Sequence, residues 1–401
     1  MIDQALIRRL SVDTPSKIVM LVVDGLGGLP DPETGLTELE AASTPNLDRL
    51  AAGGVCGLVD PVAPGITPGS APGHIGLFGY DPLVAEVGRG VLEAVGIGFV
   101  IEPGDVAARG NFCTVDARGL VTDRRAGRIS SEKGAELSGL LDGAVIDGVS
   151  IIVRPVREHR FVAVFRGTGL APDVSDTDPQ QVGVPPLPAV AQSATARRLA
   201  GVVNRWLEQA AERLADHHPA NMVLLRGFSG HPRFDTFEEV YKLRAAAIAV
   251  YPMYRGLASL LGMETLQTGS TFADEVRTLR DNYRGYDFFF IHVKGADSAG
   301  EDGDFARKVS VIETVDAGLP ELLSLSPEVL VVTGDHSTPS RLRSHSWHPV
   351  PVLLSAATCR PDRATAFSET ACLDGGLGRL PATAVMPLAM AHAGKLAKFG
   401  A

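Results

Sequence analysis

The chain has 401 residues, of which 45% are hydrophobic and 21% are charged, a composition typical of folded globular proteins that excludes wholesale disorder. Its length suits two domains, or one large domain that carries an insertion. Its 37 basic and 47 acidic residues give a formal net charge of −10, which argues against nucleic acid as a partner.

The first predicted elements are a strand and a helix. Residues 18–23, IVMLVV, form a continuous apolar run, which is typical of a strand buried on both faces of its sheet. Residues 44–53 have a threonine at the N-cap, a proline at the first helical position and a glycine at the end, which predicts a helix. A buried strand followed by a helix is the pattern of an α/β domain.

The middle of the chain has a different pattern. Short strand-like segments occur at residues 111–115, 149–156 and 160–167, separated by turn-forming residues. A Pro-rich loop at 171–188 and an amphipathic helix at about 194–216 follow them. We interpret this region as an α+β domain inserted into the α/β core.

The last third returns to the first pattern. Continuous apolar runs occur at residues 288–296, 329–334 and 350–354, with a predicted helix at 310–325 between them. We therefore predict a mostly parallel α/β sheet flanked by helices, formed by residues 1–103 and 234–401, with an inserted domain of residues 104–233. The predicted insert has 16 basic and 14 acidic residues, net +2, which leaves −12 for the core. An acidic core suits divalent cations, although charge asymmetry alone is weak evidence.

The cysteines and the apolar segments indicate the compartment. The first 17 residues lack the apolar stretch of a signal peptide, and the longest apolar window, about 245–263, is interrupted by a proline and an arginine. We therefore expect a soluble, cytoplasmic protein that does not associate with a membrane. The four cysteines form no CxxC pair, which disfavours a thiolate metal site and favours a reducing compartment: Cys56, Cys113, Cys359 and Cys372.

Acidic and histidine side chains follow three of the predicted strands. One such aspartate is ordinarily a helix cap or a turn former, but ligands bind at this edge of parallel sheets, and converging carboxylates repel one another unless a cation neutralises them. Oxygen and imidazole ligands without a thiolate suit Mn²⁺, Mg²⁺ or Zn²⁺. We therefore predict a metal cluster that includes Asp24, Asp297, Asp335 and His336.

Three further residues are candidates for the same cluster. Glu301 follows Asp297 by four residues, which one helical turn or a compact loop brings together. His345 and His348 precede the last of these predicted strands, and we expect at least one of them to be a ligand. A lone histidine is more often a structural residue.

Ser70 is the candidate nucleophile. It lies in the segment PGITPGSAPGHIGLFGYDP, where Gly69 and Gly73 allow close backbone approach and a helix start could hold a phosphate. By itself the segment is more typical of a serine in a Gly/Pro loop. A serine hydroxyl needs a base or a metal ion to react at neutral pH, and the predicted cluster would supply the metal.

The densest basic cluster lies in the predicted insert. Guanidinium groups bind phosphate and carboxylate with paired hydrogen bonds, and a neighbouring carboxylate can accept from hydroxyls. A solvated loop is an equally good explanation of these residues taken alone. The cluster consists of Asp123, Arg124, Arg125 and Arg128, with Arg226 and Lys242 as weaker candidates of the same kind.

Taken together, the motifs resemble those of the cofactor-independent phosphoglycerate mutases of the alkaline-phosphatase superfamily, most of all their shorter archaeal-type branch with bacterial relatives. Any one motif would be unspecific, but their order covers nearly the whole chain. The motifs are VVDGLGG, EAASTPNLDRLA, PGSAPGHIGLFGYDP, GRGVLEA, NFCTV, DRRAGR, NMVLLRG, HVKGAD, VVTGDHSTP and SHSWHPVPVLL.

The resemblance implies a role for each matching position. Ser70 matches the serine that becomes phosphorylated, and His74 a histidine near the transferring phosphate. One metal ion would be bound by Asp24, Ser70, Asp335 and His336, and the other by Asp297 and His345. The glycerate would be bound by Asp123 and Arg124, with looser assignments for Arg125, Arg128, Arg226 and Lys242.

The sequence departs from the family pattern at two positions. Glu301 stands where the better-known pattern has histidine, and a carboxylate there can still bind Mn²⁺ or Mg²⁺ with altered metal preference. Ala71 stands where an acidic or polar residue is common. Neither departure removes a catalytic group.

The resemblance implies interconversion of 3-phosphoglycerate and 2-phosphoglycerate, with two divalent ions, Mn²⁺ foremost and Mg²⁺, Zn²⁺ or Co²⁺ as alternatives, and without bisphosphoglycerate. The insert would orient a small phosphorylated carboxylic acid. The alternatives are a phosphatase or phosphomutase that acts on another phosphate ester or a phosphonate-pathway intermediate, and a catalytically inactive metal-binding regulator. The sequence leaves the oligomeric state open.

Overall fold

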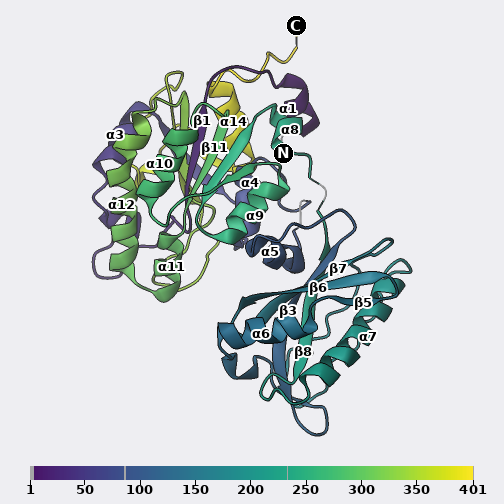
Figure 1. Ribbon diagram of the computed structural model, residues 1–401. Coiled ribbons are helices and arrows are strands. Elements are labelled where there is room, and N and C mark those ends of the chain that lie inside the picture. Colours follow the sequence, from purple (N-terminus) through teal and green to yellow (C-terminus); the bar gives the residue numbers. More distant parts are fainter. Residues whose placement is uncertain (1–3, 85–86, 233, 401) are drawn as a thin grey trace. The chain divides into compact units, whose positions relative to one another are not determined.

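The computed structural model describes residues 4–84, 87–232 and 234–400. It divides the chain into two compact units, one formed by Met1–Glu86 with Phe234–Ala401 and the other by Val87–Arg233 (Figure 1). The second unit begins before the expected residue 104, because α5 (Arg89–Gly96) packs against β3 (Val106–Val115) and β8 (Met222–Gly230) of that unit.

The first unit is built on a mixed, mostly parallel sheet. Four of its strands coincide with the predicted apolar runs, and β1 is buried along its whole length. The strand β13 is antiparallel to both of its neighbours, and every other strand pair in this sheet is parallel. Within the described residues the sheet has eight strands, in the order β10 (Glu264–Leu266), β9 (Ala245–Ala249), β11 (Phe288–Val293), β1 (Ile18–Val23), β12 (Val329–Thr333), β13 (Val350–Ala356), β2 (Val55–Asp60) and β14 (Gly378–Pro381).

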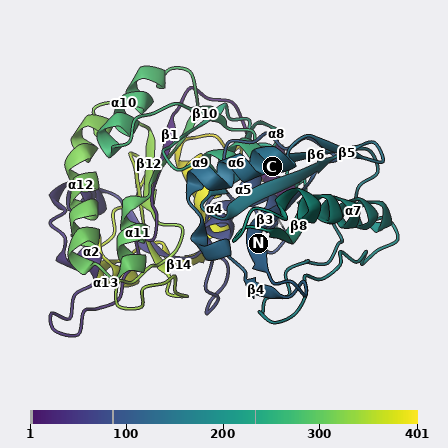
Figure 2. The same cartoon turned by 60° about the horizontal axis from the view of Figure 1, so that its bottom comes forward.

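Helices cover both faces of this sheet, which is why its central strands, such as β1, are apolar throughout. Figures 1 and 2 show α10 and α12 on one face and α4 and α9 on the other. The helix α12 begins earlier than the predicted residue 310, because the Asp304 side chain accepts a hydrogen bond from the Arg307 amide and caps it. The helices of this unit are α1 (Gln4–Leu10), α2 (Glu38–Ala41), α3 (Pro45–Gly53), α4 (Ser70–Leu77), α8 (Phe237–Tyr241), α9 (Pro252–Leu260), α10 (Phe272–Asn282), α11 (Gly295–Asp302), α12 (Phe305–Leu323), α13 (Glu369–Leu373), η2 (Ala382–Ala384) and α14 (Val385–His392).

The second unit is an antiparallel sheet with helices, so the predicted α+β insertion in a mostly parallel α/β core is confirmed. The strands run β4 (Val121–Asp123), β3, β7 (Arg160–Arg166), β6 (Val149–Arg157) and β5 (Ala144–Ile146). The strand β8 also pairs with β3, along residues 106–113. The buried Trp206 of α7 (Arg197–Leu214) packs edge-on against Phe165 in the core. The unit also contains η1 (Ala126–Arg128) and α6 (Ser131–Leu141). Among the described helices, none combines the length and apolar character needed to cross a membrane.

Candidate active site

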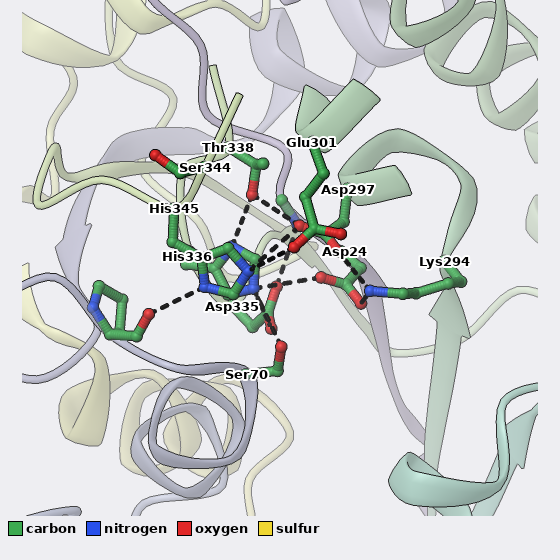
Figure 3. A network of polar contacts seen from close by, with 12 residues as sticks. Asp24, Ser70, Lys294, Asp297, Glu301, Asp335, His336, Thr338, Ser344 and His345 are labelled. Carbon is green, nitrogen blue, oxygen red and sulfur yellow. Dashed lines mark hydrogen bonds and ion pairs between the residues drawn. The ribbon is translucent and has the colours of Figure 1, made fainter. Parts of the chain in front are cut away.

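Three parallel strands bring the predicted metal ligands to one edge of the first sheet. In register, Val22 of β1 lies beside His292 of β11 and Thr333 of β12, so the carboxyl ends of these strands are level. Asp24 directly follows β1, while Asp335 and His336 follow β12. Asp297 lies in the first turn of α11, which begins just after β11. The parallel register therefore converts distant sequence motifs into one cluster (Figure 3).

The first group of candidate ligands surrounds the Nε2 atom of His336. This atom lies 3.3 Å from Asp24 Oδ1, 3.1 Å from Asp335 Oδ2 and 3.2 Å from the hydroxyl of Ser70. Asp24, Asp335 and His336 are fully buried, and neither of those two carboxylate oxygens has a hydrogen-bond partner among the described residues. A buried carboxylate oxygen that accepts no hydrogen bond is costly, so the arrangement fits a divalent cation.

The second oxygen of Asp24 is held in place by other side chains. Its Oδ2 accepts hydrogen bonds from the Tyr254 hydroxyl at 2.5 Å and from Lys294 Nζ at 3.0 Å, and it lies 3.2 Å from His292 Nε2. The rings of Tyr254 and His292 stack with their centroids 3.6 Å apart. These contacts turn Oδ1 towards His336, as an oriented metal ligand requires.

A second group of candidate ligands lies next to the first. His345 Nε2 is 3.5 Å from Asp297 Oδ1 and 3.8 Å from Glu301 Oε1, and its ring stacks on that of His336. Ligand atoms of Asp297, His336 and His345 all lie within 4.8 Å of one another. Glu301, one helical turn after Asp297, is at the rim with a side chain that is 54% exposed.

The other histidine of the SHSWHPVP segment has a different environment. His348 Nδ1 contacts the hydroxyl of Ser346 at 3.0 Å, and its ring stacks on Trp347. Of these two histidines, His345 is the one that lies beside the other candidate ligands.

Ser70 is the first residue of α4, and His74 lies one turn later. The position of Ser70 at a helix start agrees with the sequence prediction, and Gly73 is needed there because a Cβ would fall 2.2 Å from the Asp335 carbonyl oxygen. The fully buried His74 ring contacts Asp335 Oδ2 at 3.2 Å and the Ser70 carbonyl at 2.8 Å through Nδ1. This geometry gives His74 a positioning contact with Asp335.

The predicted basic cluster forms part of a cavity in the second unit. Arg124 donates two hydrogen bonds to the buried Asp178, at 2.9 and 2.7 Å, and Arg226 approaches the same carboxylate at 3.4 Å. Arg124, Arg125 and Arg226 line a cavity of about 300 Å³ together with Arg109, Asn111, His159, Arg160 and Gln180. A neighbouring cavity of about 210 Å³ is lined by Arg128 and Arg157 among others. The arginines converge in one place, as phosphate or carboxylate binding requires.

Two predicted substrate-binding residues have structural partners instead. Both carboxylate oxygens of Asp123 accept backbone N–H bonds, from Arg125 at 2.8 Å and Gly127 at 2.7 Å, and so form the turn that presents the arginines. Lys242, in the first unit, has left-handed backbone geometry at the end of α8, and its Nζ donates to the Ser11 carbonyl at 2.6 Å.

The comparisons with known proteins agree with this geometry. A family of 2,3-bisphosphoglycerate-independent phosphoglycerate mutases matches residues 51–221. A Thermotoga maritima protein named "probable 2,3-bisphosphoglycerate-independent phosphoglycerate mutase" is 50% identical over 400 residues, with 99% of each chain covered. The chain belongs to this family.

Solved structures extend the likeness to the fold of this phosphoglycerate mutase family member. A Thermoplasma acidophilum structure titled "Cofactor-Independent Phosphoglycerate mutase" is 31% identical, with a TM-score of 0.79 over 94% of this chain and 100% of that one. A Pyrococcus horikoshii protein is 28% identical, with a TM-score of 0.81 over 97% of this chain and 100% of that one. The predicted fold class, a mostly parallel sheet flanked by helices with an inserted α+β domain, and the predicted enzyme class, an isomerase of the phosphoglycerate mutase kind, are therefore confirmed.

In this mutase the buried charges compensate one another. Burial alone would raise the pKa of the Asp335 carboxyl, but the imidazoles of His336 and His74 hold that pKa well below its ordinary value. Burial also opposes the charged form of His345, yet its hydrogen bond with Asp297 prevails and raises the pKa of His345 to about 9. Neutral His345 is the metal-binding form, so an ion that binds there displaces a proton.

The residues that support the candidate ligands were not predicted from the sequence. His292 and Lys294 are two residues apart at the end of a predicted strand. This spacing places both side chains on the same face of the strand, and it could have indicated that they lie together. Tyr254, on α9, had no such signal. In the second unit, Arg109 and Arg160 were missed because they meet through strand pairing, in which β3 pairs with β7 on one side and β8 on the other.

Proposed function

We propose that the chain interconverts 3-phosphoglycerate and 2-phosphoglycerate without 2,3-bisphosphoglycerate, through a phosphoserine on Ser70 at a site for two divalent ions. The proposal rests on two buried carboxylate oxygens that accept no hydrogen bond from the described residues, one of Asp24 and one of Asp335. Both lie beside His336 Nε2, and the Ser70 hydroxyl is 3.2 Å from that nitrogen. A nucleophile beside a cation site is what phosphoryl transfer from an ester needs.

The donor set fits oxygen-preferring divalent ions. We assign one ion to Asp24, Ser70, Asp335 and His336, and the other to Asp297, Glu301 and His345. Carboxylate and imidazole donors without thiolate favour Mn²⁺, with Mg²⁺, Zn²⁺ and Co²⁺ as alternatives. When bound, the ions would supply positive charge that favours the ionised serine and neutralises the phosphate oxygens.

The side chains then have the following roles. Ser70 Oγ, after loss of its proton, attacks the phosphorus, so that an O–P bond to serine forms as the bond to the glycerate oxygen breaks. The electron pair of the broken bond goes to that oxygen, which takes up a proton. The start of α4 favours the negative charge of the phosphoryl group. The glycerate then presents its other hydroxyl, which takes the phosphoryl group back and frees Ser70. Water must be kept out while the phosphoserine exists, since hydrolysis would make the enzyme a phosphatase.

We assign the binding of the glycerate to the arginine cavity of the second unit. Arg124 is held by Asp178, whereas Arg125 and Arg160 are exposed and available to an anion. Arg109 and Arg226 add positive charge to the same cavity, and Arg128 adds it to the neighbouring one. Asp123 shapes the turn, and Lys242 is left out of the assignment because its ammonium binds a backbone carbonyl.

Replacing Arg125 by glutamine is expected to raise KM for 3-phosphoglycerate about tenfold or more while kcat changes less, because one charge-assisted hydrogen bond to the substrate is lost. Steady-state kinetics would measure both constants. Arg118→Gln is the matched control, since that arginine lies in the same unit, is 78% exposed and pairs with Asp116 instead. Equal effects of the two substitutions would contradict the assignment.

His159 is expected to remain neutral at pH 6–8 and to gain proton affinity when an anion enters the cavity. Burial and then the charge of Arg160 lower its pKa to about 4, so protonation begins only as the pH falls towards that value. Because an unfolded histidine titrates near 6.5, this group lowers the free energy of unfolding as the pH drops from about 6.5 to 4. NMR titration of the ring, assigned with His159→Gln, would measure the shift. A pKa at or above 6.5 without ligand, or no rise with 3-phosphoglycerate, would contradict this prediction.

Replacing Glu301 by alanine is expected to weaken the binding of the second Mn²⁺ ion at least about tenfold, because a carboxylate ligand is lost from that group. The affinity for the first ion is expected to stay unchanged. Calorimetric titration of the metal-free protein measures both affinities. Asp302→Asn is the control, since this neighbour on α11 is 66% exposed and pairs with Arg307. Unchanged stoichiometry and affinity in Glu301→Ala would remove Glu301 from the ligand set.

A further inference from the structure

Thr338 lies between the two groups of candidate ligands but is itself a ligand of neither. It follows β12 by five residues and is fully buried. Its Oγ1 is 2.8 Å from Asp297 Oδ1 and 2.9 Å from His336 Nδ1, so that one hydroxyl touches a member of each group (Figure 3).

A single hydroxyl proton determines the direction of both hydrogen bonds. The ionised carboxylate of Asp297 can only accept, so the Thr338 hydroxyl donates to it. The hydroxyl oxygen then accepts from His336, which requires the proton of that ring to lie on Nδ1. The lone pair of the neutral ring is thereby on Nε2, the atom that faces Asp24, Asp335 and Ser70.

The position of Thr338 is fixed by its backbone. Its N–H donates to the Gly27 carbonyl at 3.0 Å, and its own carbonyl accepts from Lys308 Nζ at 2.9 Å. The fully buried ammonium of Lys308, on α12, also donates to the Gly27 carbonyl at 2.9 Å. The loop after β12 is thus tied to the loop after β1, which carries Asp24.

The packing around Thr338 is equally close. A Cβ on Gly25 would fall 2.6 Å from Thr338 Oγ1, and a Cβ on Gly300 would fall 2.2 Å from the Thr338 carbonyl oxygen. Neither neighbour therefore has room for a side chain, so the hydroxyl has little freedom to leave its two partners.

We propose that Thr338 is a positioning residue that fixes His336 with its lone pair on Nε2 and couples the two ion sites through Asp297. This inference rests on the proposed two-ion site. The coupling follows because one hydroxyl holds one ligand of each ion, so that loss of the hydroxyl loosens both groups. The buried Lys308 is the anchor that keeps Thr338 in place.

Thr338→Val, which removes the hydroxyl and nearly keeps the shape, tests the proposal by calorimetric titration of the metal-free protein with Mn²⁺. Loss of such a partner typically weakens metal binding 10–100-fold, and we expect a loss in this range for both ions. Thr338→Ser keeps the hydroxyl and is expected to keep the wild-type affinities. Thr333→Val is the matched control, because this buried hydroxyl donates to the Pro351 carbonyl at 2.9 Å and touches no candidate ligand.

A second measurement needs no substitution at Thr338. In the wild-type protein loaded with Zn²⁺, nitrogen NMR of the histidines, assigned with His336→Gln, is expected to show a proton on His336 Nδ1 and the ion on Nε2. The opposite assignment would overturn the proposal even if Thr338→Val failed to fold.

The calorimetric outcomes separate this inference from the function on which it rests. Three outcomes would overturn the role of the hydroxyl while leaving the two-ion site intact. They are wild-type Mn²⁺ affinities in Thr338→Val, weaker binding of only one ion in that variant, or an equal loss of affinity in Thr338→Ser. A wild-type protein that binds no divalent ion would overturn the proposed function and this inference with it.

Discussion

Ser70→Ala is expected to lower the rate of interconversion about 10⁴- to 10⁶-fold, because the substitution removes the atom that accepts the phosphoryl group. Its hydroxyl lies 3.2 Å from His336 Nε2, and the remaining candidate ligands of that group are unchanged in the variant. We therefore expect Mn²⁺ binding to weaken only modestly while turnover is lost. Steady-state kinetics and calorimetric titration measure the two properties separately.

The phosphoserine gives the same prediction a direct readout. Brief reaction with substrate, acid quenching and mass spectrometry should detect phosphate on the peptide containing Ser70 in the wild-type protein and none in Ser70→Ala. Ser324→Ala is the control, since this serine at the end of α12 is exposed and its hydroxyl donates to the Glu321 carbonyl. A Ser70→Ala protein that kept full turnover would refute the proposed nucleophile.

Asp335→Asn is expected to remove the first ion and to lower kcat by about 10³-fold or more, because the substitution takes a charged ligand from the group around Ser70. It is also expected to destabilise the metal-free protein near neutral pH. The pKa of Asp335 is well below its ordinary value, so the ionised carboxylate stabilises the fold above the unfolded pKa, and this contribution is lost as the pH falls through the folded pKa. Metal titration and thermal unfolding, with and without Mn²⁺, measure these effects.

A buried aspartate elsewhere in the first unit separates metal binding from stability. Asp316 accepts hydrogen bonds from the backbone amides of Asn46 and Leu47, at 3.0 and 2.8 Å, and touches no candidate ligand. Asp316→Asn should therefore lower the unfolding temperature and leave Mn²⁺ affinity unchanged. If Asp335→Asn bound two ions as tightly as the wild-type protein, the assignment of Asp335 would be wrong.

The fold could be predicted from the sequence to the extent that it depends on burial pattern. The run 18–23 is apolar throughout because β1 lies in the middle of the sheet, and the proline and glycine of 44–53 mark the ends of α3. The antiparallel direction of β13 was not foreseen, because strand direction depends on the path of the connecting loops and leaves no trace in a short apolar run. The helix α5 contacts β3 and β8 of the second unit, and such contacts between separate segments could not be predicted from the sequence of α5 alone.

The residues of the candidate site could likewise be predicted only in part. Asp24, Asp335 and His336 could be found because each follows a predicted strand, and parallel strands end at one edge. His345 was a weaker candidate, because it precedes a strand instead. Tyr254, which donates to Asp24, and Asp178, which holds Arg124, come from a helix and a loop whose sequences carry no such signal. Their roles depend on packing between distant segments, which only the structure reveals. Lys242 is the reverse case, a weaker substrate-binding candidate that lies at the end of α8, where its ammonium donates to the Ser11 carbonyl.

The most direct test of the central claim is an enolase-coupled assay of the wild-type protein on 3-phosphoglycerate, with Mn²⁺, without bisphosphoglycerate, and with an EDTA-treated control. The account predicts turnover to 2-phosphoglycerate that disappears with EDTA and returns when Mn²⁺ is added back. No turnover on 3-phosphoglycerate, together with metal-dependent phosphate release from other phosphate esters, would contradict the mutase assignment and make the site that of a phosphatase or a mutase for another substrate.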